Sequence, residues 1–425
     1  MAWQDNYSPL SHRHIMKHIY IVDEHQSSKQ NGVGTYIRQL LKCFEGSGHD
    51  VNLLSFNSDE KEFKVERTSF YTEYHFPICG EGRFLSNGAL SIALLHLYIP
   101  DHLDNIFFVN HSPAYIFLKV LHSQYTKSKV VFVIHDQGWC APLLGNCRLF
   151  HDIIATNKST RIDKETLRYI QQYTRNERLA YRIANLIITL SQSTYHLLVN
   201  TYHVLPNKTY FIRNGYLQDD KSVDCSEIQS IRTSLGIKSD EIVILFTGRT
   251  VKSKGILELL QAYEKIWIEM PKLHLIIAGE IFNLNEYTSL TPRSASTISY
   301  VGLIKPELIK RWYAIADICV LPSYTEQCSY SGIEMLSYGK MTITTNGFSL
   351  HDMFDENTSI IVPIEHDNPH CSSLLVKNLY KAFKKVLALS EEEKNILQEN
   401  AKKKYNMYFS IGSMKQAYLT LISSL

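Results

Sequence analysis

Two carboxylates, Glu326 and Glu334, lie in the stretch YTEQCSYSGIEML with seven residues between them. The apolar run ICVLPS before them predicts a buried strand, and the small residues Ser329, Ser331 and Gly332 predict a helix start that an anion could approach closely. A carboxylate beside an anion site repels the anion, so its presence makes sense if it accepts hydrogen bonds from hydroxyl groups of the same ligand. A nucleotide-sugar carries such hydroxyls at both ends of its diphosphate. Taken alone, the spacing is more typical of a loop acid and a helix acid that share no role.

Two basic residues, Arg249 and Lys254, follow another predicted strand, EIVILFTG. Gly248 ends that strand and allows close backbone approach, and a helix is expected to open near Gly255. Two cations at a strand-to-helix junction suit a diphosphate, which binds fixed positive charge. The loop lacks the GxxxxGK[ST] pattern of a P-loop. The alternative is a solvated loop whose basic residues bind nothing.

The N-terminal half holds further candidates at strand ends. The turn SSKQNGVGTY precedes a helical pattern, and its Gly32 and Gly34 would let the backbone approach phosphate groups. His135 ends the buried strand VVFVIH, with Asp136 next, and His111 follows the strand NIFFVN. A histidine at a strand end of an α/β domain points toward the ligand crevice, but a purely structural role is the alternative for each.

Two sets of parallel strands are needed to position these candidates. Short apolar runs alternate with helical patterns from 17–22 to 208–216, and again from 241–248 to 359–363. We therefore predict an α/β fold of two Rossmann-like domains that face each other across a central cleft, with the ligand at the carboxyl ends of the strands. The predicted division is a leader-like segment 1–15, an N-terminal domain 16–213, a C-terminal domain 214–405 and a final helix 406–425 that packs back towards the N-terminal domain.

Composition narrows the class of protein. The 425 residues predict two domains, and 44% hydrophobic with 20% charged residues is typical of a globular chain. A formal net charge of +2 argues against a dedicated nucleic-acid binder. No run is long and apolar enough to span a bilayer, and no signal peptide is visible, so a cytoplasmic location is expected.

In combination and in this order, the motifs resemble those of the retaining glycosyltransferases of family 4, also called glycosyl transferase group 1, which have the two-domain GT-B fold. In that family a strand leads to Gly-Arg and then to Lys-Gly, as in the basic loop here. The family pattern E-G-F-G-x-x-x-x-E-A-M-A-x-G matches EQCSYSGIEMLSYG, with both glutamates, Met335 and Gly339 in register. The Asn214-Gly215 pair at the domain boundary also matches, and the resemblance covers residues 16–425.

The resemblance implies a role for each matching residue. Arg249 and Lys254 would hold the donor diphosphate, Glu334 would bind the ribose hydroxyls, and Glu326 would hydrogen-bond the transferred sugar. His135 would lie near that sugar and act with these residues in catalysis. The positions implied to contact the donor are Gly32, Gly34, Gly248, Cys328, Ser329, Tyr330, Ser331 and Glu334.

The expected activity is transfer of a hexose from a nucleotide-diphosphate sugar to a glycan, lipid-linked or protein acceptor, with retention of the anomeric configuration. No cofactor is expected, and a UDP-sugar is favoured over a GDP-sugar. No metal is expected, because no DxD motif ends a strand and Arg249 and Lys254 would neutralise the diphosphate. The alternatives are a two-carboxylate hydrolase, a nucleotide-sugar epimerase of the same fold, and a non-catalytic scaffold or binding protein. Gln327 and Cys328 replace the Gly-Phe that the family usually has beside the sugar.

The acceptor is expected to bind the N-terminal domain. The loop 137–163 is long and aromatic, which is typical of functional loops, and it supplies Trp139 as an acceptor residue together with His111. The helix after it carries arginines at heptad spacing, at positions 168, 175 and 182. Two interpretations stay open for that helix: a solvated face balanced by Glu165 and Glu177, or a face in peripheral contact with an anionic membrane.

Overall fold

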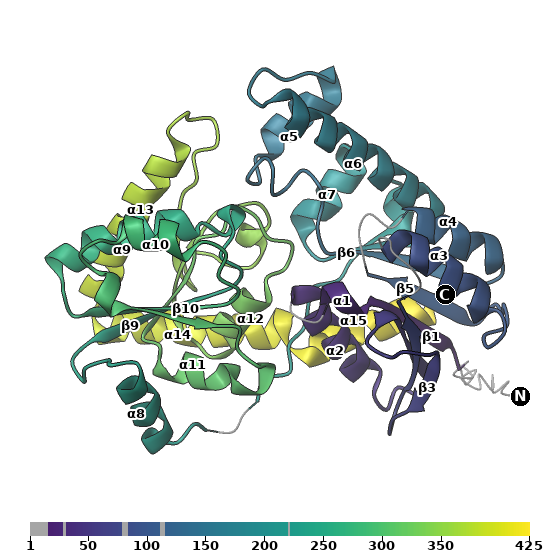
Figure 1. Cartoon of the computed structure of the whole chain (residues 1–425), viewed down its shortest axis with the longest axis horizontal. Helices are drawn as coiled ribbons and strands as arrows, with labels where there is room; N and C mark the ends of the chain where they lie inside the picture. Colours follow the sequence, from purple (N-terminus) through teal and green to yellow (C-terminus); the bar gives the residue numbers. More distant parts are fainter. Residues whose placement is uncertain (1–15, 29–30, 79–83, 111–114, 220–221) are drawn as a thin grey trace, which may run out of the picture.

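The chain forms two α/β domains that lie side by side (Figure 1). This computed structural model describes residues 16–28, 31–78, 84–110, 115–219 and 222–425. The predicted leader 1–15 lies outside the described residues. The predicted pair of parallel α/β sheets is confirmed.

The N-terminal domain is built on an eight-stranded sheet with the order β3-β4-β2-β1-β5-β6-β7-β8. Among the described strands of this sheet, only β3 and β4 pair antiparallel. Its strands are β1 (His18–Glu24), β2 (Asp50–Ser58), β3 (Lys64–Arg67), β4 (Thr72–Pro77), β5 (Asn105–Val109), β6 (Lys129–Ile134), β7 (Leu186–Thr189) and β8 (Thr209–Phe211). The central strands are buried along their whole length, as expected for parallel strands covered by helices on both faces.

The helices of this domain connect the strands. They are α1 (His25–Ser28), α2 (Gly32–Phe44), α3 (Phe84–Leu95), α4 (Tyr115–Gln124), α5 (Cys147–Thr156), α6 (Lys164–Ile183) and α7 (Gln192–Asn200). The predicted loop 137–163 therefore contains a helix, α5. Asn146 caps α5 by accepting the backbone N–H of Leu149, and Asp163 caps α6 in the same way through Thr166.

The C-terminal domain has a six-stranded, wholly parallel sheet with the order β11-β10-β9-β12-β13-β14. Its strands are β9 (Ile242–Thr247), β10 (Leu273–Ala278), β11 (Ile298–Gly302), β12 (Ile318–Leu321), β13 (Met341–Thr345) and β14 (Ile360–Val362). Its helices are α8 (Cys225–Ser234), α9 (Ile256–Glu269), α10 (Leu284–Leu290), α11 (Ile309–Ile315), α12 (Tyr330–Ser337), α13 (Cys371–Ala388) and α14 (Glu391–Lys404).

The C-terminal segment crosses from the second domain to the first (Figure 1). After α14, a π-helical turn, Tyr405–Phe409, leads into α15 (Ile411–Ser423). Helix α15 packs against α2, where the hydroxyls of Tyr36 and Tyr418 share a buried hydrogen bond and Lys415 Nζ donates to the Glu45 carbonyl at 2.9 Å. The last helix thus ties the two domains together.

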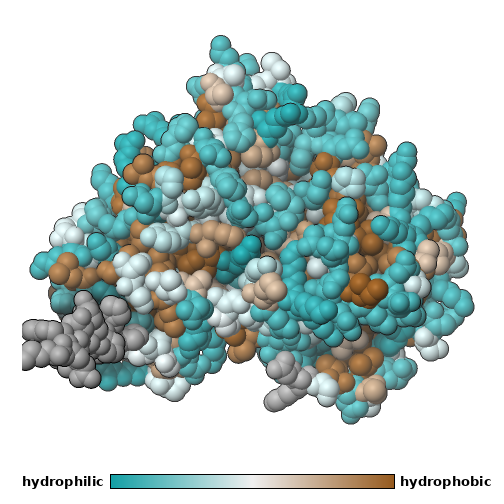
Figure 2. Space-filling model, turned by 180° about the vertical axis from the view of Figure 1, so that it is seen from behind, coloured by the Kyte–Doolittle hydropathy of each residue, from teal (hydrophilic) through white to brown (hydrophobic). Residues whose placement is uncertain are grey.

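Hydrophilic side chains dominate the face drawn in Figure 2, with separate hydrophobic patches between them. Among the described helices, none has the length and hydrophobicity needed to cross a membrane.

Candidate active site

The loop that carries Glu326, called here the glutamate loop (residues 322–329), connects β12 to α12. Strand β12 pairs in parallel with β9, so the loops after both strands leave from the same edge of the sheet. Ser329 caps α12, because its side chain accepts the N–H of Gly332 at 3.3 Å. The helix begins where the small residues predicted it, with Glu326 before it and Glu334 inside it.

Lys254 and Glu326 form an ion pair in this site. Lys254 Nζ lies 2.5 Å from Glu326 Oε1, and Ser323 Oγ donates to the same oxygen at 2.8 Å. The two side chains are only 20% and 9% exposed, so the pair is largely withdrawn from solvent. The residue predicted to bind phosphate and the residue predicted to bind sugar therefore act on each other directly.

Close packing of two loops brings this pair together. After β9 the chain makes a 3₁₀ turn, Lys252–Lys254, and Gly255 follows with φ of 69°. A Cβ at position 255 would collide with the carbonyl oxygen of Pro322, so only glycine permits this approach. The N–H of Tyr324 also donates to the Ser253 carbonyl at 2.9 Å. The sequence separation of 72 residues between the ion-pair partners is bridged by these backbone contacts.

Arg249 extends from the end of β9 into solvent. It follows Gly248, whose N–H donates to the Ala278 carbonyl at 2.9 Å. Its charge and that of Lys254 act on Asp136, which belongs to the other domain. The surrounding protein desolvates the Asp136 carboxyl and so raises its pKa, and the two cations oppose the rise. The meeting place of the two domains therefore holds two cations, Arg249 and Lys254, and two carboxyl groups, Asp136 and Glu326.

Glu334 lies in an enclosed, polar position on α12. The hydroxyl of Tyr313 donates to Glu334 Oε2 at 2.9 Å and also lies 3.1 Å from Thr247 Oγ1. Burial raises the pKa of Glu334 to about 7, and the Tyr313 hydrogen bond works against that rise. A carboxyl group held in this way gains from further hydroxyl donors, because they stabilise its ionised form.

His135 is half-buried at the end of β6, on the N-terminal side of the site. Its ring meets the ring of Tyr36 edge-on, with 4.4 Å between centroids. His135 Nε2 lies 3.5 Å from Asn110 Oδ1, and the Asn110 amide nitrogen is already donating to the carbonyls of Val22 and Phe108. Because Oδ1 can only accept, this contact favours the tautomer with the proton on Nε2. Asn110, which was not predicted, therefore orients the imidazole.

Gly32 and Gly34 form the first turn of α2. The Asn31 side chain caps this turn by accepting the N–H groups of Val33 at 2.9 Å and Gly34 at 3.4 Å. A Cβ at position 34 would collide with the Ser28 carbonyl, whereas a Cβ at position 32 would meet nothing. Only Gly34 is thus required by packing, and a phosphate reaching this turn would compete with its cap.

Three other predicted donor contacts belong to the glutamate loop and α12. Cys328 is buried, burial raises its thiol pKa to about 12, and its carbonyl accepts from Asn214 Nδ2 at 2.8 Å. Tyr330 is within electrostatic range of Arg38 on α2, so its side chain reaches towards the N-terminal domain. Ser331 is half-buried with its carbonyl 3.4 Å from the Tyr313 hydroxyl. At position 328 the backbone carbonyl makes the hydrogen bond to Asn214, and the thiol is buried.

Trp139 does not fit its predicted role as an acceptor contact. It is 1% exposed, and its ring stacks on Phe150 at 4.6 Å and meets Phe348 of the other domain edge-on at 5.0 Å. The aromatic character of the loop is therefore used for packing between the domains. His111, the other predicted acceptor residue, lies outside the described residues.

Direct contacts join the domains beside the glutamate loop, and the sequence alone did not predict them. The Thr194 hydroxyl donates to Gln327 Oε1 at 2.5 Å, and the Ser193 N–H donates to Asp352 Oδ2 at 2.9 Å. Gln327 is buried, so the departure from the family's usual glycine has a structural use here. That departure was the one signal in the sequence that could have pointed to this contact.

Glu177 on α6 also differs from its predicted place on a solvated helix face. It is 4% exposed, and its carboxylate accepts the N–H of Gly138 at 3.0 Å and the hydroxyl of Tyr202. Burial raises the pKa of Glu177 to about 7. Because Gly138 follows His135 by three residues, Glu177 supports the loop that carries the predicted catalytic histidine.

Within the described ranges, histidine, cysteine, aspartate and glutamate side chains form no cluster of three or more with the arrangement of a metal site.

Two family models match the chain, one for each domain. The model described as Glycosyltransferase Family 4 matches residues 30–216, and the model described as Glycosyl transferases group 1 matches residues 227–404. The first match ends after β8 and the second begins in the first turn of α8, where the structure passes from one sheet to the other.

Curated relatives are similar at low identity. A D-inositol 3-phosphate glycosyltransferase of Paenarthrobacter aurescens is 22% identical over 351 residues, which cover 81% of this chain and 83% of the relative. An alpha-monoglucosyldiacylglycerol synthase of Acholeplasma laidlawii is 24% identical over 37% of this chain and 43% of the relative. The chain spans less than half the length of several curated relatives that it matches.

Solved structures share the fold across almost the whole chain. Anabaena HepE, solved in complex with UDP and glucose, superposes with a TM-score of 0.68 at 16% identity, covering 96% of this chain and all of that one. The chain therefore belongs to the family 4-like glycosyltransferases with the GT-B fold, because both family models match it and its two parallel sheets place their loops opposite each other.

Proposed function

We propose that this protein transfers a hexose from a nucleotide-diphosphate sugar to an acceptor with retention of the anomeric configuration. The observation that carries the proposal is the ion pair of Lys254 with Glu326. Arg249 lies in the same loop as Lys254, and Glu334 lies in helix α12, which begins shortly after Glu326. A hydrolase with two carboxylates would need no cations there. A donor that combines diphosphate with hydroxyl groups at both ends uses all four residues.

In the proposed donor complex, Lys254 and Arg249 bind the diphosphate. The Lys254 ammonium has three donors, so it can keep its bond to Glu326 while it binds a phosphate oxygen. The second oxygen of Glu326 is left for a hydroxyl of the sugar, and Glu334 accepts from the ribose hydroxyls. The HepE complex with UDP and glucose supports UDP as the nucleotide.

In the proposed reaction, the bond between the anomeric carbon and the diphosphate oxygen breaks, and its electron pair leaves with the diphosphate. The acceptor oxygen forms the new bond on the same face of the sugar, and its proton passes to the departing phosphate oxygen. Lys254 and Arg249 stabilise the charge that develops there, which is the task of preorganised electrostatic groups. His135, with its proton on Nε2, orients the sugar from the N-terminal side.

We further propose that the acceptor, a glycan, a lipid-linked sugar or a protein, binds the N-terminal domain near Asp136. Tyr169 supports this placement, because its ring is 48% exposed, packs 5.5 Å from Tyr173 and lies within electrostatic range of Asp136. A cytoplasmic protein with peripheral membrane contact is the proposed setting; the name of the A. laidlawii relative, a diacylglycerol glycoside synthase, supports a lipid-linked acceptor.

The test is incubation of the protein with a panel of UDP- and GDP-sugars while free nucleotide is measured, with and without EDTA. A transferase should slowly transfer the sugar to water and so release nucleotide even without an acceptor. This release should continue in the presence of EDTA, because Arg249 and Lys254 take the place of a metal. The anomeric configuration of the released sugar, read at once by NMR, should match the donor. Conversion of the sugar while it stays attached to the nucleotide would indicate an epimerase, and no turnover with any donor would indicate a scaffold.

A further inference from the structure

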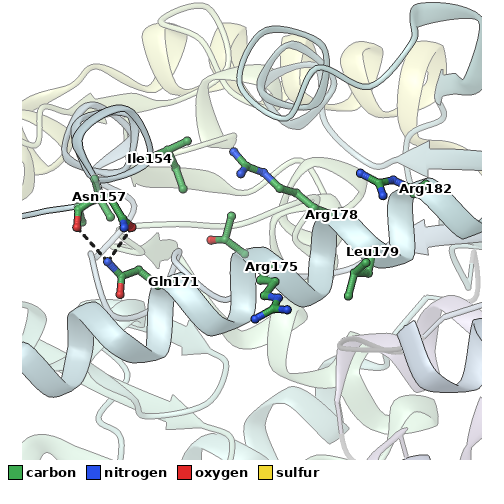
Figure 3. A pocket seen from close by; sticks show the side chains of 9 residues that line it. Ile154, Asn157, Gln171, Arg175, Arg178, Leu179 and Arg182 are labelled. Carbon is green, nitrogen blue, oxygen red and sulfur yellow. Dashed lines mark hydrogen bonds between the residues drawn. The ribbon is translucent and has the colours of Figure 1, made fainter.

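A groove lies between α5 and α6 on the N-terminal domain, called here the α5–α6 groove. It encloses about 260 Å³. Figure 3 shows Arg178 extending from α6 across the groove, with Arg182 one turn further along. Its lining residues are Ile153, Ile154, Asn157, Gln171, Thr174, Arg175, Arg178, Leu179 and Arg182.

Three arginines give this groove a strong positive charge. Arg175, Arg178 and Arg182 follow helical spacing on α6, and all three are exposed; in Figure 3 Arg178 and Arg182 extend from the same edge of the helix, and Arg175 points away from them. Aspartate and glutamate are absent from the lining, and among the described residues none of the three arginines forms an ion pair. The acid nearest in sequence, Glu177, is buried, and its carboxylate accepts the Gly138 N–H and the Tyr202 hydroxyl.

The rest of the groove indicates what kind of anion would bind. At one end Gln171 Nε2 donates to the carbonyl and side-chain oxygens of Asn157, at 3.0 and 2.8 Å, which closes the groove (Figure 3). Ile153 and Ile154 form an apolar wall beside the arginines. Guanidinium groups match the geometry of phosphate oxygens, and an apolar wall suits an organic substituent.

We propose that the α5–α6 groove binds a phosphate ester, either a soluble phosphorylated compound or the headgroup of an anionic phospholipid. None of the residues assigned to the proposed donor site lines the α5–α6 groove, so the groove is separate from that site. The proposal therefore stands or falls independently of the glycosyltransferase reaction.

The test compares three variants with the unchanged protein. Arg178→Gln combined with Arg182→Gln removes two guanidinium groups of the groove. Arg168→Gln removes an exposed arginine of the same helix outside the groove, and Lys254→Gln removes charge from the donor site. Binding of glycerol 3-phosphate is measured by calorimetry at constant ionic strength, and co-sedimentation is measured with phosphatidylcholine vesicles with and without phosphatidylglycerol. Thermal melting confirms that each variant is folded.

The unchanged protein should bind one or both probes, and the double variant should weaken that binding by about ten-fold or more, since two charge-assisted contacts are lost. The two control variants should bind almost as before. Binding to glycerol 3-phosphate identifies a soluble ligand class, and binding only to vesicles with phosphatidylglycerol identifies a lipid headgroup. The proposal is overturned if the unchanged protein binds neither probe, if Arg168→Gln or Lys254→Gln weakens binding as much as the double variant, or if vesicle binding ignores phosphatidylglycerol.

Discussion

Replacement of Glu334 by glutamine should remove a pH dependence from nucleotide binding. In the structure this carboxyl is enclosed on α12, with Tyr313 as its hydrogen-bond donor, and burial raises its pKa to about 7. Ribose hydroxyls bind the ionised carboxylate better than the protonated acid, because an ionised acceptor makes the stronger hydrogen bond. Affinity for the nucleotide should therefore rise as pH increases through this pKa.

The size of the effect follows from the titration. With a pKa of about 7, about one tenth of Glu334 is ionised at pH 6 and about nine tenths at pH 8. If the ribose selects the ionised form, UDP should bind about ten-fold more tightly at pH 8 than at pH 6. Near pH 7 each binding event should release about half a proton.

The assay is calorimetric titration of UDP into the protein from pH 6 to pH 8. Repetition in two buffers with different ionisation enthalpies yields the number of protons released. Glu334→Gln should weaken binding at pH 8 and remove the part of the pH slope and of the proton release that Glu334 contributes; the terminal phosphate of UDP, with a pKa of about 6, contributes the rest. Glu326→Gln is the matched control, because UDP carries no transferred sugar, and its pH slope should remain.

Two results would refute this reasoning. If Glu334→Gln keeps the same pH slope as the unchanged protein, another group titrates and Glu334 is not the ribose ligand. If Glu326→Gln loses the slope while Glu334→Gln keeps it, the roles of the two glutamates are reversed.

Three further predictions concern the other charged residues. Arg249→Ala and Lys254→Ala should each lower kcat/KM about 30- to 1,000-fold, the usual range for a preorganised electrostatic contact. Lys254→Arg should restore little of the lost activity. Of the two alanine variants, only Lys254→Ala should also lower the melting temperature, because it leaves the carboxylate of Glu326 without its partner. Unchanged kinetics would place the diphosphate elsewhere. Glu326→Ala should lower kcat more than it raises the donor KM, since the sugar contact matters most in the transition state; a pure KM effect contradicts this. Glu177 has a folded-state pKa of about 7, above its unfolded value, so its contribution to stability is complete below about pH 4.5 and falls by about 3 kcal/mol as pH rises to 7. Glu177→Gln should flatten that part of the stability curve, measured by urea unfolding from pH 4.5 to 8, and an unchanged slope would show that Glu177 is not responsible.

Much of the fold could be predicted because parallel strands buried on both faces read as continuous apolar runs. All six residues of Leu273–Ala278, which lies within the second predicted set of strands, are buried. The edge strand Lys64–Arg67 left no such signal, because all four of its residues are exposed. Helix α8 lies between the predicted strands 208–216 and 241–248, and none of its residues is fully buried.

The sequence predicted at which strand ends the candidate residues lie, and it did not predict which residues they contact. Arg249, Glu326 and His135 all lie beyond the carboxyl ends of parallel strands, as predicted, because strand direction alone decides that edge of a sheet. The burial of Trp139 against Phe348 and of Glu177 behind the His135 loop depends on how segments distant in sequence pack. Hydrophobic periodicity along one helix or strand carries no information about such packing.

The contact between Lys254 and Glu326 changes how the two glutamates of the sequence motif should be understood. A carboxylate beside a departing diphosphate would oppose the reaction, because negative charge develops next to it. Lys254 lies against that carboxylate and neutralises Glu326, and in the proposed complex its remaining N–H groups would be donated to phosphate. The acid can then bind a sugar hydroxyl without repelling the leaving group. Glu334 would need no such partner if it binds the ribose as proposed, because the ribose would lie away from the reacting bond. In the structure Tyr313 donates to its carboxylate, and burial raises its pKa to about 7.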